Sequence, residues 1–158
     1  MSASSNAGLA QEHVFDIRID FADRWRWGPV GGAGEQGYTS VGGGAITGPR
    51  LNGRVVPHSG ADYAFVRPDG VIDLNAHYLL EADDGTMIYI FNRGYVIPAK
   101  RAPGDDPKAF LQPSYFRCTP YFKAPAGPHE WLNRTVIIGG GKRHTNPDHS
   151  VFNYYALI

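Results

Sequence analysis

The sequence predicts an all-β protein, folded as an antiparallel sandwich or barrel. Between Gly42 and Arg93, short apolar segments are interrupted by Gly-Pro, Ser-Gly, Pro-Asp-Gly and Asp-Asp-Gly. Glycine supplies the positive φ of a turn, proline presets its first φ, and aspartate bonds its own backbone two residues on. Turns that recur roughly every eight to twelve residues are typical of hairpin-connected strands. No segment shows the apolar period of a convincing amphipathic helix.

The predicted strands begin with the clearest alternation in the chain. From His13 to Phe21, every second side chain is phenylalanine or isoleucine, which indicates a half-buried strand. Residues 23–37 combine the cluster Trp25-Arg26-Trp27 with a glycine-rich stretch, so we expect an ordered loop that caps one end of the fold. The next predicted strands, separated by the turns above, are residues 39–46, 50–56, 61–67, 71–81 and 86–93.

The segment 98–113 interrupts this series of strands. It contains four prolines and five charged residues, a composition that no central strand tolerates. We therefore expect a long surface excursion that is a candidate lid. The last predicted strands are residues 114–122, 131–138 and 151–158, with the polar loop GGGKRHTNPDH between the final two.

Length and composition limit the class of protein. A chain of 158 residues suits one domain, and we expect a flexible N-terminus over 1–12 and a single domain over 13–158. Basic and acidic residues number 15 each, so no excess of charge favours nucleic acid or an anionic membrane as a partner. The single cysteine, Cys118, excludes an intrachain disulfide. Because no signal peptide and no membrane-spanning apolar run are evident, we expect a cytoplasmic protein.

Several short motifs are weak matches to known ligand sites. GGAGEQG lacks the flanking strand and helix of a dinucleotide fold, and GGGK lacks the spacing of a P-loop. His144 and His149 have Asp148 between them, but a zinc site needs three or four ligands in a fixed geometry. A surface loop is the simpler interpretation of these histidines. We therefore expect no metal site.

Four longer segments carry a family resemblance. GPRLNGRVVPHSGADY, RPDGVIDLNAHYLLEADDG, SYFR and EWLNRTVIIGGG occur in the order and near the spacing of domain-of-unknown-function family 3237, found in bacteria and fungi. The resemblance extends from about Phe15 to the C-terminus. It implies a single closed antiparallel β-barrel, calycin- or lipocalin-like, with long capping loops. The cluster Trp25-Arg26-Trp27 and the segment 98–113 depart from the family pattern, and they leave substrate choice open.

The same resemblance implies a chemistry. Catabolic members from soil bacteria are similar to proteins linked with cofactor-free conversion of lignin-derived phenolics, including decarboxylation. The expected protein is therefore a carbon–carbon lyase of aromatic catabolism that uses no cofactor. Its expected partner is a small aromatic substrate. We expect it to bind neither nucleic acid nor a membrane.

Strand alternation identifies candidate catalytic residues. In the predicted strand 114–122, Tyr115 and Arg117 share one face, while Phe116 and Cys118 share the other. If the barrel encloses a ligand cavity, the YFR match favours Arg117 inside, where its planar fork binds a substrate carboxylate. The alternative is that the apolar face lies inside and Arg117 points outward.

Asp62 and Tyr78 are two further catalytic candidates. Asp62 follows the Ser59-Gly60 turn, either as a capping residue or as a carboxylate at the barrel mouth, where burial raises its pKa toward a value useful to an acid or base. Tyr78 shares a face with apolar neighbours, so we expect it inside. A buried tyrosine hydroxyl needs a partner, and a substrate phenol or carboxylate is one such partner.

Five residues are candidates for substrate binding, namely Trp131, Asn133, Arg93, Tyr89 and Trp27. On a strand, Trp131 and Asn133 share a face and offer a stacking wall and an amide, although core packing is the alternative. Arg93 follows Tyr89 at a period of two and is either a second anion anchor or an exposed strand end. Trp27 belongs to the predicted capping loop.

The leading hypothesis is decarboxylation of a phenolic aromatic acid. Asp62 or Tyr78 assists removal of the phenol proton, and a quinone-methide form accepts the electrons released as CO2 leaves. Arg117 with Tyr115 holds the carboxylate, while Trp131 stacks on the ring and Asn133 orients it. The alternatives are an isomerase, cyclase or hydratase acting on an aromatic or polyketide-like substrate, a non-catalytic small-molecule carrier, and a homo-oligomer joined through apolar strand faces.

Overall fold

The computed structural model describes residues 8–158, so most of the predicted flexible segment 1–12 lies outside the described residues. Nearly all regular structure is β-sheet, with one short 3-10 helix, η1. Within residues 8–158, no helix is long and apolar enough to cross a membrane. The elements are β1 Gln11–Trp27, β2 Glu35–Thr47, β3 Gly53–Val55, β4 Ala61–Asp62, β5 Phe65–Val66, β6 Ile72–Ala82, β7 Met87–Ile97, β8 Tyr115–Lys123, η1 Glu130–Arg134, β9 Ile137–His144 and β10 His149–Leu157.

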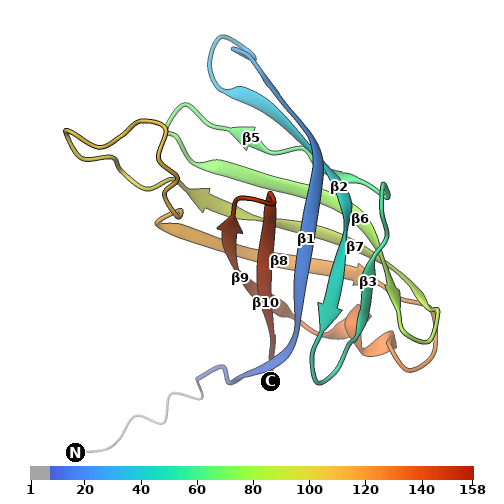
Figure 1. The fold of residues 1–158 in the computed structure, drawn as a ribbon. Helices are drawn as coiled ribbons and strands as arrows, with labels where there is room; N and C mark the ends of the chain where they lie inside the picture. The colour runs from blue at the N-terminus through green and yellow to red at the C-terminus, as the bar shows by residue number, and fades with distance from the viewer. Residues whose placement is uncertain (1–7) are drawn as a thin grey trace, which may run out of the picture.

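The strands form a closed antiparallel barrel (Figure 1). Successive strands pair around the sheet, and β10 then pairs with β1, which also pairs with β2. The short strands β3, β4 and β5 lie one after another between β2 and β6, and each pairs with both. With these three counted as one position, the barrel has eight strands. The predicted all-β barrel is therefore confirmed.

Packed rings fill the end of the barrel that lies near η1. Phe15 lies edge-on to Phe122 and to Trp131, with ring centroids 6.0 and 6.4 Å apart. Leu132 of η1 is buried in the same core, and the guanidinium of Arg50 lies 3.7 Å from the centroid of the Trp131 ring. Aromatic pairs and a cation over an indole stabilise this end in addition to the stabilisation from the apolar area that they bury. This end is closed.

The predicted loop over residues 23–37 is wrong. β1 continues to Trp27 and β2 begins at Glu35, so the two strands form a hairpin arm that extends past the rest of the barrel (Figure 1). Trp25 packs against Tyr38 across this arm, with ring centroids 5.4 Å apart. In the half of the arm that β1 forms, most side chains on both faces are exposed. The sequence there therefore shows no apolar alternation that would indicate a strand.

The other corrections lie near the C-terminus. The predicted strand 131–138 begins with the 3-10 helix η1, and β9 starts only at Ile137. The predicted polar loop GGGKRHTNPDH is largely strand, because its glycines make room for core rings. A Cβ at Gly139 would lie 2.6 Å from the ring of Tyr154, and one at Gly141 would lie 2.7 Å from that of Phe116. Residues 98–113 contain no strand, as predicted.

Close packing of β4 against β6 yields a first prediction. A Cβ at Gly60 would lie 1.7 Å from the carbonyl oxygen of His77. We expect Gly60→Ala to push β4 away from β6 and to lower the free energy of unfolding by about 1–3 kcal/mol in urea titrations. Val136→Ala is the control, because Val136 is 63% exposed and its truncation changes stability by less than about 0.5 kcal/mol. Equal stability of the two variants would contradict the prediction.

Candidate functional site

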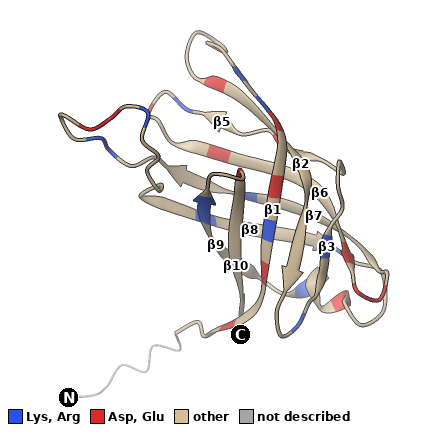
Figure 2. Ribbon diagram, viewed as in Figure 1, with Lys and Arg blue, Asp and Glu red and all other residues tan. Residues whose placement is uncertain are grey.

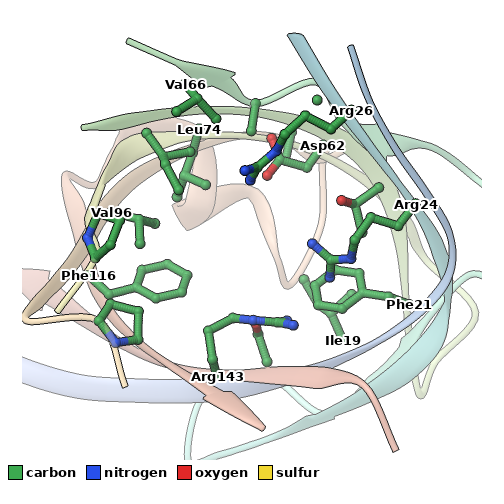
Figure 3. Close-up of a pocket in the computed structure, with 18 of the residues that line it drawn as sticks. Ile19, Phe21, Arg24, Arg26, Asp62, Val66, Leu74, Val96, Phe116 and Arg143 are labelled. Atoms are coloured by element: carbon green, nitrogen blue, oxygen red, sulfur yellow. The ribbon is translucent and has the colours of Figure 1, made fainter. Parts of the chain in front are cut away.

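The barrel encloses a cavity of about 570 Å³ at the end opposite η1 (Figure 3). Its walls are mainly apolar and come from strands all around the barrel, with Ile19, Leu74 and Phe116 among them. The arm and residues of the segment 98–113 contribute to its rim. A largely apolar cavity of this size with a few polar groups suits a small organic molecule.

Asp62 places a carboxyl group in the cavity wall (Figure 3). β4 holds it between Thr39 of β2 and Ala76 of β6. Its Oδ1 accepts a hydrogen bond of 3.0 Å from the backbone N–H of Asn75, whereas Oδ2 receives no hydrogen bond from the described residues. Burial raises the pKa of Asp62 above its ordinary value of 3.8, against the Asn75 hydrogen bond and the charge of Arg24. Asp62 is thus a carboxyl with a strengthened hold on its proton.

Two arginines meet at the cavity mouth around one carboxylate. Arg24 donates from Nη2 to Oδ2 of Asp148 over 2.9 Å, and Arg143 donates from Nη2 to Oδ1. Burial of Asp148 opposes its ionisation, but the hydrogen bonds from these arginines outweigh it, so the pKa of Asp148 is lowered. Both guanidiniums lie over the ring of Phe21, 5.5 and 5.1 Å from its centroid. One carboxylate balances only one of the two cations.

The charge of the cavity lining is positive. Four guanidiniums line it, whereas Asp62 is the only carboxyl among the described lining residues. Arg26 lies 3.6 Å from a carboxylate oxygen of Glu35, and Arg101 donates to backbone carbonyls of its own loop. A low-dielectric cavity with this lining favours an anionic ligand.

Polar groups also lie deeper in the barrel, in the cavity wall formed by Tyr78 and Asn92. Asn92 donates from Nδ2 to the hydroxyl of buried Tyr154 over 3.2 Å. The Tyr78 hydroxyl and Asn92 Oδ1 are buried and make no well-aligned hydrogen bond within the described residues, although the Tyr154 hydroxyl lies close enough to Tyr78 to influence its pKa. Burial raises the pKa of Tyr78 and Tyr154 well above their ordinary value of 10.0, and it raises that of Cys118 to about 11. These groups are therefore neutral.

Only two of the four predicted catalytic residues lie at the cavity. Asp62 and Tyr78 line it, but Tyr115 and Arg117 point outward from β8, so the prediction that they face a ligand cavity is wrong. Burial alternates at every position of β8, and Phe116 and Cys118 fill the interior. An unpaired guanidinium inside would cost far more than these apolar side chains.

Trp131 and Asn133 lie away from the cavity, so their predicted roles as stacking wall and orienting amide are wrong. They belong to η1, where the two-residue period of a strand does not apply. Asn133 Oδ1 accepts from the backbone N–H of Ala124 over 2.7 Å, and its Nδ2 donates to the Ala124 carbonyl over 2.8 Å. Trp131 packs between the core and Arg50. Both residues hold the closed end together.

The remaining candidates lie on outer surfaces. Tyr89 and Arg93 are on the outer face of β7, where the Tyr89 hydroxyl pairs with Nδ1 of His77 and Arg93 is exposed. Trp27 is 53% exposed at the end of β1 and does not line the cavity. Trp25, two residues earlier on the arm, does. The predicted binding roles of Tyr89, Arg93 and Trp27 thus have no place in this cavity.

Sequence reasoning missed Arg24, Arg143 and Asn92. The pairing of β1 with β2 shifts in register between Phe21 and Arg24. Beyond this shift, the inward and outward alternation of His13 to Phe21 no longer predicts which side chains of β1 point inward. Arg143 lay in a predicted loop that is in fact β9. Asn92 could have been found, because it follows Ile88 and Ile90 at the two-residue period of the inward face.

The raised pKa of Asp62 predicts a pH-dependent stability. The folded carboxyl holds its proton more tightly than the unfolded one, so its contribution is complete below pH 3.8 and is lost as pH rises through the folded pKa. Asp62→Asn lacks this loss. We therefore expect urea titrations to show the wild type losing stability relative to Asp62→Asn as pH rises. A difference that does not vary with pH would contradict this expectation.

Asp84 gives a control of opposite sign. Hydrogen bonds from the side chain and backbone of Thr86, and from His129, lower the pKa of this carboxyl to about 2. Its contribution to stability is therefore present above its ordinary pKa and lost as pH falls toward 2. Wild type should gain stability relative to Asp84→Asn with rising pH, in the same titrations.

A matched pair of tyrosines tests the unpartnered hydroxyl. Tyr78→Phe removes a buried hydroxyl that makes no well-aligned hydrogen bond within the described residues, so we expect the free energy of unfolding to stay constant or to rise by about 1 kcal/mol. Tyr154→Phe removes the acceptor of the Asn92 amide and should lower it by roughly 1–3 kcal/mol. Thermal and urea unfolding measure both. Equal losses in the two variants would show that the Tyr78 hydroxyl is partnered.

Proteins of known sequence and structure resemble this chain along its length. The UPF0311 protein RPA1785 of Rhodopseudomonas palustris (strain ATCC BAA-98 / CGA009) is 31% identical over 145 residues, covering 87% of this chain and 91% of that protein. The UPF0311 protein CA_C3321 of Clostridium acetobutylicum is 29% identical over 153 residues, covering 92% of each.

Solved structures share the barrel. A beta-barrel like protein (ABAYE2633) from Acinetobacter baumannii AYE has a TM-score of 0.83 and 29% identity, covering 98% of this chain and 99% of its own. An enzyme from Penicillium herquei has a TM-score of 0.74 at 18% identity, covering 99% of each chain, and shows the fold alone. The family model described as "Protein of unknown function (DUF3237)" matches residues 9–157, and the chain belongs to this family.

Proposed function

We propose that this protein is a cofactor-independent lyase that decarboxylates a small phenolic acid inside the barrel. The carrying observation is Asp62, a carboxyl with a raised pKa in an apolar cavity whose lining holds four guanidiniums. Such a site attracts an anion and holds a proton beside it. Both are needed when CO2 leaves a carbon atom and a proton replaces it.

The sheet register supports one orientation of the proposed substrate. Arg24 and Asp62 both pair with Thr39, so they lie at one level on either side of β2. Tyr78 lies two residues beyond Ala76, the partner of Asp62 on β6, which places it about 7 Å deeper. One aromatic ring with its acid group fits this interval. The carboxylate would lie toward the mouth and the ring oxygen toward Tyr78.

The interior polar groups complement a phenolic oxygen. The Tyr78 hydroxyl and Asn92 Oδ1 are without partners among the described residues, and one donates while the other accepts. A phenol accepts a hydrogen bond from the Tyr78 hydroxyl and donates one to Asn92 Oδ1. A phenolate only accepts from the Tyr78 hydroxyl. Unpaired polar groups in an apolar wall favour a ligand that forms hydrogen bonds with them over an analogue that cannot.

The reaction balances with the residues at hand. The substrate binds as its phenol, whose hydroxyl accepts from Tyr78 and donates to Asn92 Oδ1. Its carboxylate faces Arg24 and Arg143. Asp62 donates its proton to the carbon that carries the carboxylate, giving a quinone-methide or dienone form whose ring oxygen is still protonated. The carbon–carboxylate bond then breaks, CO2 leaves, and the electron pair of that bond returns to the ring, which restores the phenol. Asp62 regains a proton from water.

This assignment revises which groups act. Arg24 and Arg143 take the place that Arg117 held in the sequence-based hypothesis, because among the arginines that line the cavity these two meet around a single carboxylate, Asp148. Asp62 acts as an acid rather than a base, because burial raises its pKa. The Penicillium herquei enzyme has the same fold, so the barrel is compatible with catalysis.

Mass spectrometry of phenolic acids incubated with the metal-free protein tests the proposal. We expect products lighter by CO2, and we expect Asp62→Asn to lower kcat by about 10²–10⁴-fold. Turnover should fall as pH rises through the raised pKa of Asp62, because the protonated form is the donor. Asp83→Asn, which alters an exposed carboxyl, should keep full activity.

The anion site has its own test. Arg24→Gln should raise KM for the phenolic acid by roughly tenfold or more, since a charge-assisted hydrogen bond contributes about 1.5–3 kcal/mol. Arg54→Gln, at an exposed arginine of β3 that pairs with Glu81, is the control and should leave KM unchanged. Stoichiometric binding without turnover would make the barrel a carrier, and a product of unchanged mass would make it an isomerase. Full activity in Asp62→Asn would exclude the acid role.

A further inference from the structure

A second hollow, of about 720 Å³, lies on the outer side of the sheet over β7, β8, β9 and β10. We propose that it is a binding site for a small aromatic anion, separate from the barrel cavity. Tyr115 and Arg117 of β8 line it, and β8 directs Phe116 and Cys118 to the opposite, inner side of the same sheet. The sheet itself therefore stands between the two sites.

The hollow exists because β8 and β9 barely pair. Within the described residues, their register is limited to Arg117 with Gly140 and Cys118 with Gly139, whereas β7 and β8 pair along the whole of β8. Outside these two positions, no pairing between β8 and β9 is found within the described residues. Gly140 contributes no side chain to the outer face, and the guanidinium of Arg117 lies above it.

Aromatic rings form the walls of the hollow. Tyr95 of β7 and Tyr115 of β8 line it and are 52% and 45% exposed, and Tyr155 of β10 lines it from the other side. Tyr95 and Tyr115 occupy diagonal positions on adjacent strands, since Tyr95 pairs with Arg117. Rings at diagonal positions are within reach of one planar ligand. Tyrosine offers a π-face to such a ligand and a hydroxyl at its rim.

Arg117 is positioned to bind an anion there. Its Nη1 donates to the Phe116 carbonyl over 2.9 Å, which fixes the guanidinium near the sheet. A Cβ at Gly140 would lie 3.3 Å from Nη1, so glycine at that position leaves room for the guanidinium. No other hydrogen bond from Arg117 is found within the described residues, and its remaining N–H groups form a fork that matches a carboxylate or phosphate.

The charge of the hollow is uncompensated. Arg117 and Lys142 line it, no carboxylate does, and neither cation forms a salt bridge within residues 8–158. β1 is different, because acidic and basic residues alternate along it (Figure 2) and Arg18 donates to Asp20 over 2.9 Å. A neutral chain thus carries a local positive site among tyrosines. An aromatic ring bearing a carboxylate or a phosphate matches both features.

NMR titration of the full ¹⁵N-labelled chain tests the proposal with two probes. 4-Hydroxybenzoate represents a free aromatic carboxylate, and uridine monophosphate represents a nucleotide. We expect millimolar additions to shift the Arg117 Nε–H and Gly140 amide signals. Arg117→Gln should weaken binding, read from Gly140, by about tenfold or more. Arg93→Gln, on the same outer surface but outside the hollow, should keep the wild-type affinity.

The outcomes separate the sources and the two sites. Shifts with one probe alone would identify the carboxylate or the nucleotide as the ligand class, and both results support the site. The shifts should persist in Arg24→Gln, because the hollow does not depend on binding in the barrel. Equal shifts with neutral phenol would overturn the anion site. So would the absence of shifts with both probes, or equal weakening by Arg93→Gln.

Discussion

Closure of the sheet is the constraint on which this protein depends. β1 pairs with β10 on one side and with β2 on the other, so the sheet has an inside and an outside. Every strand then divides its side chains between these two sides. β8 shows the result most plainly, because Phe116 and Cys118 are buried while Tyr115 and Arg117 face out. Without closure, neither the cavity nor the outer hollow would be defined.

Closure also determines where polar groups are tolerated. The end near η1 is filled with rings and, within residues 8–158, contributes no polar group to the cavity, whereas the open end admits arginines from β1 and β9. Between them lies Asp62, held on the two-residue strand β4 by pairing with both neighbours. A carboxyl near an apolar wall takes a raised pKa because charge is poorly solvated there. Position in the barrel, rather than residue type, raises the pKa of Asp62.

Interruptions of regular pairing coincide with the polar features of both sites. The register shift between Phe21 and Arg24 precedes the arginine that reaches the cavity mouth. The short contact between β8 and β9 opens the outer hollow beside Arg117. Bulges and diverging strands change the direction of side chains without breaking the barrel. In this protein, each interruption of strand pairing lies beside an arginine, Arg24 at the mouth of the barrel cavity and Arg117 in the outer hollow.

The sequence alone determined the all-β class, most strands and the inward position of Tyr78, because turn residues and the two-residue period are local properties. For Asp62 the sequence left two positions open, a turn cap and the barrel mouth, and the pairing of β4 with β2 and β6 decided between them. Only the tertiary structure decided that Arg117 faces outward and that Arg24 and Arg143 meet around Asp148. Arg24 and Asp148 are 124 residues apart in the chain, and a strand with two acceptable faces does not reveal which one closure turns inward.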